Sequence, residues 1–396
     1  MQQYRRLALS SVLGVMVLTG CGGSSSSGTL TGSTSSGQNY AVIGAISGDY
    51  SASSISLVDD LSRLDIVNGY AATDKSDIVV GAYGDYFYRI GRYNQDNLTK
   101  YSLSNPTQAE WQFSVNEGSE SANPYQLVFV SNEKAYLLRY GSSKLWVINP
   151  SVAANDEAHF KIGEIDLSAY DSVDGKPEMA AAVLVGNRLF VVMQGMDTQY
   201  VPGKAWMAVI DTATDKEINT GKGGSLKGVP LSVRNPLDID AADGAVYIAG
   251  AGRYAGFSGT PAEYTGGIEK VNTSTYASTL VLDDGDETTH PYGQITALEV
   301  VSATEIVFHG YQGWGDGGLY RLDLTTQTVD QAVFNGINHQ DIKVLEMDPL
   351  GRLWVGLGDY SAPSIQILNP QNQALISTLL LTQNPGSLVF SKTGLK

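Results

Sequence analysis

The residues best suited to acid–base or metal chemistry in this chain are two histidines, His290 and His339, which lie in polar links before strand-forming runs. Carboxylates occur in comparable links at Glu178, Asp238 and Asp341. Two histidines and a carboxylate can bind a metal ion or transfer protons. No third histidine recurs at such a position, and no nucleophile motif accompanies them. An enzyme of the lyase or hydrolase type is therefore an alternative, while a turn-capping role is favoured for each histidine.

A second candidate site is the acidic run DDGDE at residues 283–287. Its carboxylates, Asp283, Asp284, Asp286 and Glu287, offer the oxygen ligands that Ca²⁺ prefers. The run lacks the length and ligand order of an EF-hand loop, so a solvated acidic turn is the favoured interpretation. Ca²⁺ is the one cofactor that the sequence suggests, and no cofactor is required.

These residues occupy links between repeated strand-forming units. One unit begins at Pro124, and we expect its four strands at residues 125–131, 134–140, 144–149 and 161–168. Related steps begin the other units, at Lys75, Pro177, Pro236, Pro291, His339 and Pro385. The interval is about 50 residues, and the alternating strands end in Asn or Asp turn chemistry. Four strands in a repeat of this length predict a β-propeller.

The two ends of the chain complete the ring. The last unit supplies one strand at residues 387–391, and the first ordered segment supplies three, at 41–47, 54–59 and 63–68. A blade built from both termini leaves no open edge strand in the ring. We therefore expect an all-β, seven-bladed β-propeller with four antiparallel strands per blade over residues 40–396. Six or eight blades are alternatives, because the first repeat is weak.

One strand-and-turn segment carries a family resemblance. VIDTATDKEI, residues 209–218, resembles the V-I-D-x-x-T hairpin that repeats in YncE-like and NHL-type β-propellers of bacterial envelopes. The resemblance extends over residues 40–396 and concerns the architecture. It implies a seven-bladed ring with a binding role, and it implies no particular reaction.

The first 20 residues are typical of a secretory signal peptide. Arg5 and Arg6 precede a short apolar run, and the ending Leu-Thr-Gly-Cys at residues 18–21 resembles the lipobox of bacterial lipoproteins. The resemblance implies cleavage before Cys21, the only cysteine in the chain, and acylation of that residue, for example with palmitate. Several acyl chains on one protein anchor it stably to a membrane.

A linker rich in Gly, Ser and Thr follows Cys21, so residues 21–39 are expected to form a lipidated, flexible tether. Gly22, in place of an aspartate, implies the outer membrane by the enteric sorting rule. The side of that membrane on which the domain lies is left open. The formal net charge of −16 disfavours nucleic acid as a partner, because like charges repel.

The antiparallel order of strands divides the loops between two faces. If strands a to d run outwards from the centre, the b–c hairpins and the links from d to the next a emerge on one face. The links carry polar residues that we expect at the mouth of the channel, the predicted mouth set: Asn123, Lys176, Glu178, Asn235, Asp238, His290, His339, Asp341 and Asn384. The b–c loops carry aromatic residues and arginines, the predicted aromatic set: Tyr83, Tyr86, Arg139, Tyr140, Tyr200, Arg253, Tyr254, Phe257, Tyr311, Trp314 and Tyr360.

The aromatic loops favour a binding function. Gly-Asp-Tyr recurs with its tyrosine at Tyr50, Tyr86 and Tyr360, whereas the c–d turns of the other face are shorter and mostly lack aromatic residues. Tyrosine and tryptophan give a large contact area at low entropic cost. We therefore favour non-catalytic binding of a protein, peptide or glycan partner. For any single residue of these sets, packing between blades or turn capping is the favoured alternative.

Overall fold

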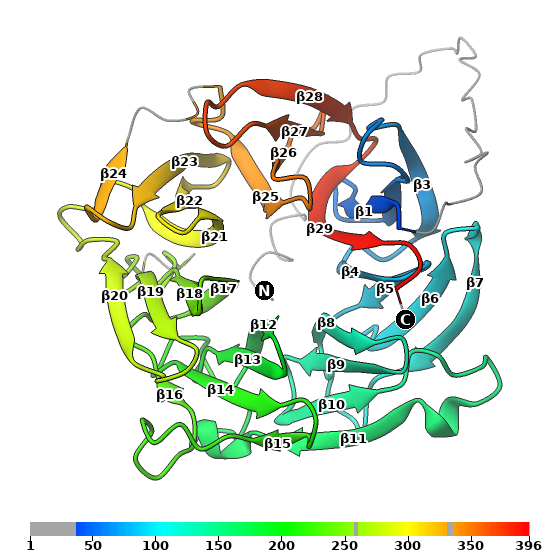
Figure 1. Cartoon of the computed structure of the whole chain (residues 1–396), viewed down its shortest axis with the longest axis horizontal. Helices are drawn as coiled ribbons and strands as arrows, with labels where there is room; N and C mark the ends of the chain where they lie inside the picture. The colour runs from blue at the N-terminus through cyan, green and yellow to red at the C-terminus, as the bar shows by residue number, and fades with distance from the viewer. Residues whose placement is uncertain (1–36, 257–259, 331–333, 335, 396) are drawn as a thin grey trace.

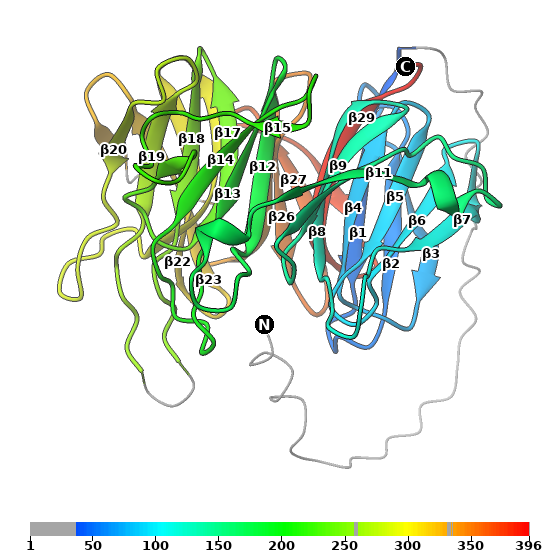
Figure 2. The same ribbon diagram turned by 90° about the horizontal axis from the view of Figure 1, so that it is seen from below.

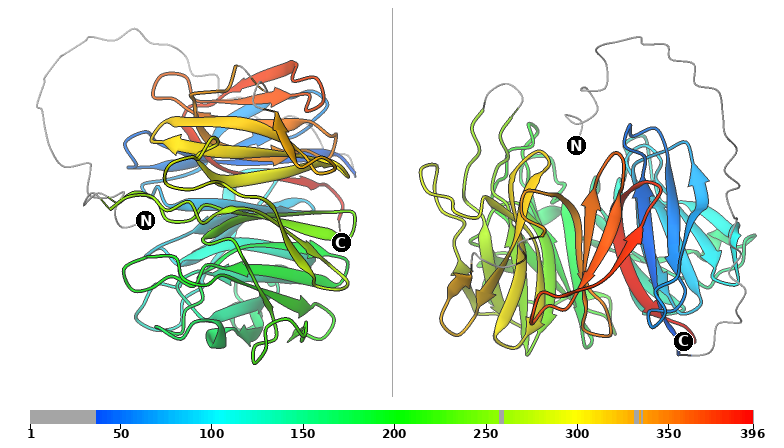
Figure 3. Two further views of the ribbon diagram at one scale, coloured as in Figure 1. Left: turned by 90° about the vertical axis from the view of Figure 1, so that its left-hand side faces the viewer. Right: turned by 90° about the horizontal axis from the view of Figure 1, so that it is seen from above.

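The computed structural model describes residues 37–256, 260–330, 334 and 336–395. Seven antiparallel sheets are arranged around a central channel as the blades of a propeller (Figure 1). Each sheet has a path of four strands, and their strands run between the two faces of the ring (Figures 2 and 3). This confirms the predicted all-β architecture of seven four-stranded blades.

The blades are numbered in chain order, with strands given from the channel outwards. Blade 1 contains β29 (Asn384–Lys392), β1 (Asn39–Ile46), β2 (Ser53–Val58) and β3 (Ile66–Thr73). Blade 2 contains β4 (Ile78–Tyr83), β5 (Tyr86–Gly91), β6 (Asn97–Ser102) and β7 (Asn105–Ser114). Blade 3 contains β8 (Pro124–Ser131), β9 (Lys134–Arg139), β10 (Lys144–Ile148) and β11 (Lys161–Asp166). Blade 4 contains β12 (Met179–Val185), β13 (Arg188–Met193), β14 (Trp206–Asp211) and β15 (Lys216–Glu217), with β16 (Val229–Pro230) also paired to β14.

Blade 5 contains β17 (Pro236–Ala242), β18 (Ala245–Gly250), β19 (Gly267–Asn272) and β20 (Ser278–Leu282). Blade 6 contains β21 (Gln294–Ser302), β22 (Glu305–Gly313), β23 (Asp316–Asp323) and β24 (Thr328–Asp330). Blade 7 contains β25 (Asp341–Met347), β26 (Leu353–Gly358), β27 (Ser364–Leu368) and β28 (Leu375–Leu380). Two short 3₁₀ helices, η2 (Glu157–His159) and η3 (Ser168–Tyr170), flank β11.

Apolar packing between neighbouring blades holds the ring together. Because the middle strands of a blade are covered on both sides, β2 and β18 are buried at every position. The described residues form seven apolar clusters, and each cluster lies between two adjacent blades. Between blades 3 and 4, for example, Leu145 and Val147 share a cluster with Val191 and Ala208. Burial of such a side chain contributes about 1.5–3 kcal/mol, so stabilisation is distributed around the whole ring.

Blade 1 is built from both ends of the chain, as predicted. β1 and β29 pair antiparallel from Asn39 opposite Lys392 to Ile46 opposite Asn384, with a bulge beside Gly44. A Cβ atom on Gly44 would lie 2.5 Å from Ser387 Oγ and 3.2 Å from Val80 Cγ1, so the close approach of these strands requires a glycine here. The outer strand β3 begins three residues later than predicted.

The innermost strands of all blades begin at equivalent positions relative to their b strands. The prolines in the links do not mark these positions reliably. β12 begins at Met179 and β21 at Gln294, whereas the sequence repeat had placed these starts at Pro177 and Pro291. The links differ in length, so a proline within a link is not at a fixed distance from the strand. At the beginning of each innermost strand, the residue that pairs with the end of strand b is polar in all seven blades. These residues form the mouth ring: Asp77, Asn123, Glu178, Asn235, Gln294, Asp341 and Asn384.

Both ends of the described domain lie on the face opposite the b–c loops, which we call the plain face. β1 is a b strand, so its first residue, Asn39, lies on the plain face. The Asn132 side chain in the β8–β9 turn donates a 2.9 Å hydrogen bond to the carbonyl of Leu395. The C-terminal end lies at the same side of the ring in Figure 2. Among the described residues, no helix is both long and apolar enough to cross a membrane.

Closure by β1 and β29 gives a first prediction. Gly44→Val should lower the free energy of unfolding by about 1–3 kcal/mol, because the added side chain overpacks the strand pair against Ser387 and Val80. Urea denaturation followed by circular dichroism measures the change. Gly313→Ala is the control, since no atom lies within 4 Å of a Cβ placed there. Equal destabilisation by the two substitutions would contradict the role assigned to Gly44.

Candidate functional site

The b–c face carries the exposed aromatic residues of the described chain. Four aromatic side chains are largely exposed there: Tyr50 at 53%, Tyr200 at 56%, Trp314 at 61% and Tyr360 at 85%. All four lie in b–c loops, those of blades 1, 4, 6 and 7. No other aromatic residue in the described part of the chain is comparably exposed. The predicted contrast between the two faces is therefore present in the structure.

Part of the predicted aromatic set is buried instead. Arg139 is 2% exposed, lies over the Trp146 ring at 4.1 Å and donates to the carbonyl of Val115. The Tyr140 ring stacks on Tyr125 at 4.4 Å and is 9% exposed. Val115 follows the last strand of blade 2, and the Tyr140 hydroxyl donates to Gln194 of blade 4. Both residues therefore lie between blades, which was the favoured alternative for single members. Phe257 lies outside the described residues.

Tyr83 and Tyr86 lie on the plain face, so their predicted place on the b–c face was wrong. β4 and β5 are strands a and b of blade 2, and Gly84 (φ 59°) and Asp85 form the turn between them. The Tyr40 hydroxyl donates to the carbonyl of Tyr86. A Gly-Asp-Tyr step has the same sequence in an a–b turn as in a b–c loop, which caused the misplacement.

A cavity of about 250 Å³ lies between the inner strands of blades 6 and 7, beside the b–c loop of blade 5. We call it the Trp314 pocket, and its lining residues are Tyr254, Thr296, Ala297, His309, Tyr311, Ile342, Lys343, Val344 and Leu345. Tyr254 and Tyr311 meet edge to face, with ring centroids 5.5 Å apart. The Lys343 ammonium lies 5.1 Å from the Trp314 ring and 2.8 Å from Asp341 Oδ1. Trp314 does not line the cavity itself, but its exposed ring lies beside the lining residue Lys343.

His309, a residue that the sequence patterns did not single out, forms part of the pocket wall. Its Nδ1 lies 2.7 Å from the Thr296 hydroxyl, and its Nε2 is buried without a hydrogen-bond partner. Burial, with a smaller effect of the Lys343 charge, lowers the pKa of His309 to about 4, so the ring is neutral at physiological pH. Gly317 allows this position, because a Cβ there would lie 2.4 Å from Nε2. A histidine inside an apolar strand gives no local sequence signal.

The two histidines predicted at the channel mouth have separate partners. The His290 ring stacks on Tyr264 at 4.0 Å, and its Nδ1 lies 2.9 Å from the carbonyl of Asp286. His339 pairs with Asp316 at 3.0 Å. Neither joins a group of three close metal-ligating side chains in the described part of the chain. The structure therefore does not assemble the acid–base constellation considered from the sequence.

Several polar residues of the inner strands bond to the next blade. Asp238 Oδ2 accepts from the backbone N–H of Leu298, and Gln126 Oε1 accepts from Ala182. In each case the inner edge of the following blade gains a partner for its backbone. Burial raises the pKa of Asp238 to about 6. Asp238 therefore has a clear structural role.

The remaining members of the predicted mouth set divide similarly. Asn123 and Asn235 are buried at the mouth ring, where Asn235 Nδ2 donates to the carbonyl of Gly252. Lys176 precedes the ring and pairs with Glu120. Asn384 Oδ1 accepts from the backbone of Asp359, which fixes the loop that carries Tyr360.

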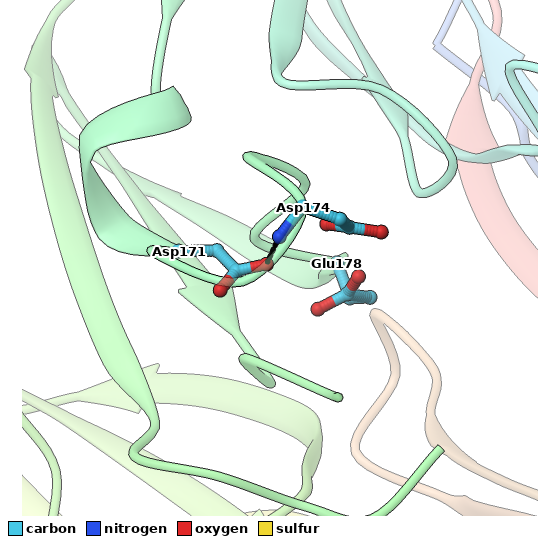
Figure 4. Close-up of side chains that lie close together, drawn as sticks. All are labelled: Asp171, Asp174 and Glu178. Atoms are coloured by element: carbon cyan, nitrogen blue, oxygen red, sulfur yellow. Dashed lines mark hydrogen bonds between the residues drawn. The ribbon is translucent and has the colours of Figure 1, made fainter. Parts of the chain in front are cut away.

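The residues best placed to hold a cation are Asp171, Asp174 and Glu178, whose potential ligand oxygens lie within 4.8 Å of one another (Figure 4). The Asp174 N–H donates to Asp171, and Glu178 Oε2 accepts from the N–H of Met196 at 2.7 Å. Burial, assisted by the charge of Asp174, raises the pKa of Glu178 to about 8. Such carboxylates are chemically suited to a hard cation.

The predicted Ca²⁺ ligands in residues 283–287 do not form a group of this kind. Asp283 and Asp286 accept hydrogen bonds from N–H groups of their own loop. Asp284 is buried and accepts from Gly266. Glu287 is exposed. Two of the four carboxylates therefore serve the backbone of their own loop.

Comparisons with known proteins identify the fold alone. No protein-family model and no curated protein matches the chain. A candidate 6-phosphogluconolactonase from Bacteroides uniformis matches with a TM-score of 0.59 and 10% identity, over 89% of this chain and 99% of that one. A Lactobacillus plantarum protein matches with a TM-score of 0.59 and 12% identity over the same shares. A candidate 6-phosphogluconolactonase from Bacteroides fragilis has a TM-score of 0.55 and 11% identity, over 91% and 99%.

The raised pKa of Glu178 predicts a pH dependence of stability. The ordinary pKa of a glutamate is 4.5, so the folded protein holds the proton of Glu178 more tightly than the unfolded chain does. The stability that protonated Glu178 contributes is complete below about pH 4.5 and is lost as the pH rises to about 8. At pH 9 the native chain must bury an ionised Glu178, whereas Glu178→Gln carries no such charge. The free energy of unfolding of Glu178→Gln, relative to that of the native chain, should therefore be higher at pH 9 than at pH 5. The expected differential is about 2–4 kcal/mol, since one pKa unit corresponds to about 1.4 kcal/mol.

Urea midpoints of both proteins at pH 5 and pH 9 measure this differential. Glu287→Gln, at an exposed position of another loop, is the control and should leave the pH dependence unchanged. A pH dependence that is the same in the native chain and in Glu178→Gln would show that Glu178 ionises normally in the folded protein.

Proposed function

We propose that this chain is a lipid-anchored protein of the bacterial outer membrane, of the YncE-like or NHL-type class, whose propeller is a non-catalytic binding module. The observation that carries the binding role is the location of Tyr50, Tyr200, Trp314 and Tyr360, all on the b–c face. Rigid aromatic side chains are effective recognition groups, and exposed apolar surface on one face often marks a binding site. The partner is a protein, a peptide or a glycan.

The position of the tether supports this proposal. The described domain begins on the plain face, where β1 starts at Asn39. A lipid on Cys21 would therefore hold the domain by its plain face, through a linker with a root-mean-square span of roughly 23 Å. The b–c face would then be directed away from the anchoring membrane. Anchor and recognition surface would not compete for the same side of the ring.

A single observation favours an enzyme as the second candidate. The Thr296 hydroxyl lies 2.7 Å from Nδ1 of the neutral His309 in the pocket wall, and a hydroxyl beside a base is the first requirement of nucleophilic catalysis. The opposite nitrogen of His309 has no partner to orient the ring. Catalytic triads contain that third group. Binding is therefore the better-supported function.

The binding role can be tested with the mature acylated protein as bait in the solubilised envelope of its source bacterium. The triple substitution Tyr50→Ala, Trp314→Ala and Tyr360→Ala removes exposed rings without touching the interblade cores, so folding should be preserved. We expect the native chain to retain envelope components that this variant loses, by at least tenfold in quantitative mass spectrometry. Circular dichroism checks the fold of each bait.

The matched control replaces three apolar residues that are more than half exposed and lie away from the b–c face, Ile162, Leu350 and Leu375, by alanine. This control should capture the same components as the native chain. If the aromatic variant and the native chain capture identical sets, or if neither captures anything, recognition through the b–c face is wrong.

A further inference from the structure

We propose that the Trp314 pocket binds one neutral sugar unit of an oligosaccharide, with Tyr360 and Tyr50 as neighbouring stacking positions. This inference rests on the proposed binding function and names the ligand chemistry of one part of the b–c face. It is carried by the charges around the pocket, by the arrangement of aromatic rings and by the volume of the cavity.

The charged groups beside the pocket are paired with one another. Lys343 and Asp341 are 2.8 Å apart, and Arg253 and Glu263 are 2.6 Å apart. His339, in the link between blades 6 and 7, pairs with Asp316 at the beginning of β23 at 3.0 Å. A charged ligand would have to separate such a pair, at an electrostatic cost that a neutral ligand avoids. The net charge of −16 further disfavours an acidic polysaccharide.

The polar groups that remain suit hydroxyl groups. Asp341 offers acceptors and Lys343 offers donors, so the pair can serve a hydroxyl, which both donates and accepts. The Thr296 hydroxyl and the neutral His309 ring contribute further polar wall. Together with Asp341 beside it, the wall combines donors and acceptors with little net charge, which matches the chemistry of a sugar.

The aromatic rings supply the stacking surfaces that the C–H faces of a sugar require. Trp314 stands 61% exposed beside the pocket, and the edge-to-face rings of Tyr254 and Tyr311 form part of the wall. Tyr360 packs close to blade 1, since a Cβ on Gly48 would lie 2.9 Å from its ring. Exposed rings of blades 6, 7 and 1 therefore follow one another around the channel mouth, as an extended chain of sugar units requires.

The size of the cavity limits what can enter it. Its volume is about 250 Å³, which is smaller than the usual drug-sized pocket of about 300–1,000 Å³. One sugar ring is the appropriate unit for such a cavity. The rest of an oligosaccharide would lie over the exposed rings outside it.

The test uses the mature acylated protein in detergent and a panel of neutral tetrasaccharides: malto-, cello-, xylo-, manno- and chitotetraose. Tri-lysine and trigalacturonate are the cationic and anionic probes. Trp314 is the only one of the five tryptophans that is exposed, the others being at most 8% exposed. Binding of a neutral tetrasaccharide should therefore shift the tryptophan emission to the blue, and isothermal titration calorimetry gives its Kd.

Trp314→Ala should weaken this binding at least tenfold, and Tyr360→Ala should weaken it by a smaller factor. Leu350→Ala, an equally apolar change on the plain face, should leave the Kd unchanged. Tri-lysine also probes Asp49 and Asp359, two carboxylates of the neighbouring aromatic loops whose oxygens accept hydrogen bonds from their own serines.

The outcomes separate this inference from the proposed function. Loss of neutral-tetrasaccharide binding in Trp314→Ala, with retention in Leu350→Ala, supports the sugar site. If no neutral tetrasaccharide binds, or if only a charged probe binds, the sugar site is wrong. The binding function itself then stands or falls with the capture of envelope components by the b–c face. Failure of both experiments would overturn both proposals.

Discussion

The pairing of β1 with β29 is the interaction on which the other features depend. It turns a row of seven sheets into a closed ring, because it adds an apolar boundary between blades 7 and 1 to the six boundaries between blades that follow one another in the chain. Without it, blade 1 would lose its inner strand and the ring would have two open ends, a form of exposed edge that proteins avoid. The relative positions of all b–c loops follow from this closure, including the loops of blades 1 and 7 that carry Tyr50 and Tyr360.

The channel illustrates why polar residues at the centre of a propeller need not form a site. The inner edge of each innermost strand has no further strand beside it, so its backbone groups require other partners. Asp238 and Gln126 supply some of them to the next blade. The cost of this solution is electrostatic: burial and neighbouring carboxylates raise the pKa of Glu299 and Glu346 well above the usual range. These acids of the inner strands thus belong to the structure, whereas the rings of Trp314 and Tyr360 on the b–c face are mostly exposed.

The fold could be predicted from the sequence because its signals are local and repeated. Turn chemistry and strand alternation recur about every 50 residues, and the incomplete units at the two ends complement each other. The candidate functional site was harder to predict from the sequence. The start of β12 at Met179 instead of Pro177 depends on the length of a link. The burial of Arg139 depends on Trp146 in a neighbouring strand. His309 becomes part of a pocket only when blades 5, 6 and 7 meet.

The distribution of exposed aromatic residues is the strongest argument that the two faces have different roles. Burial of a large apolar side chain contributes about 1.5–3 kcal/mol, a gain that Trp314 and Tyr360 largely forgo. The same repeats build the plain face with short polar turns, so the architecture does not require exposed rings at a loop. Their distribution therefore supports the proposed recognition role of the b–c face. The domain begins on the opposite face, so the proposed lipid tether would leave the aromatic face free to contact a partner.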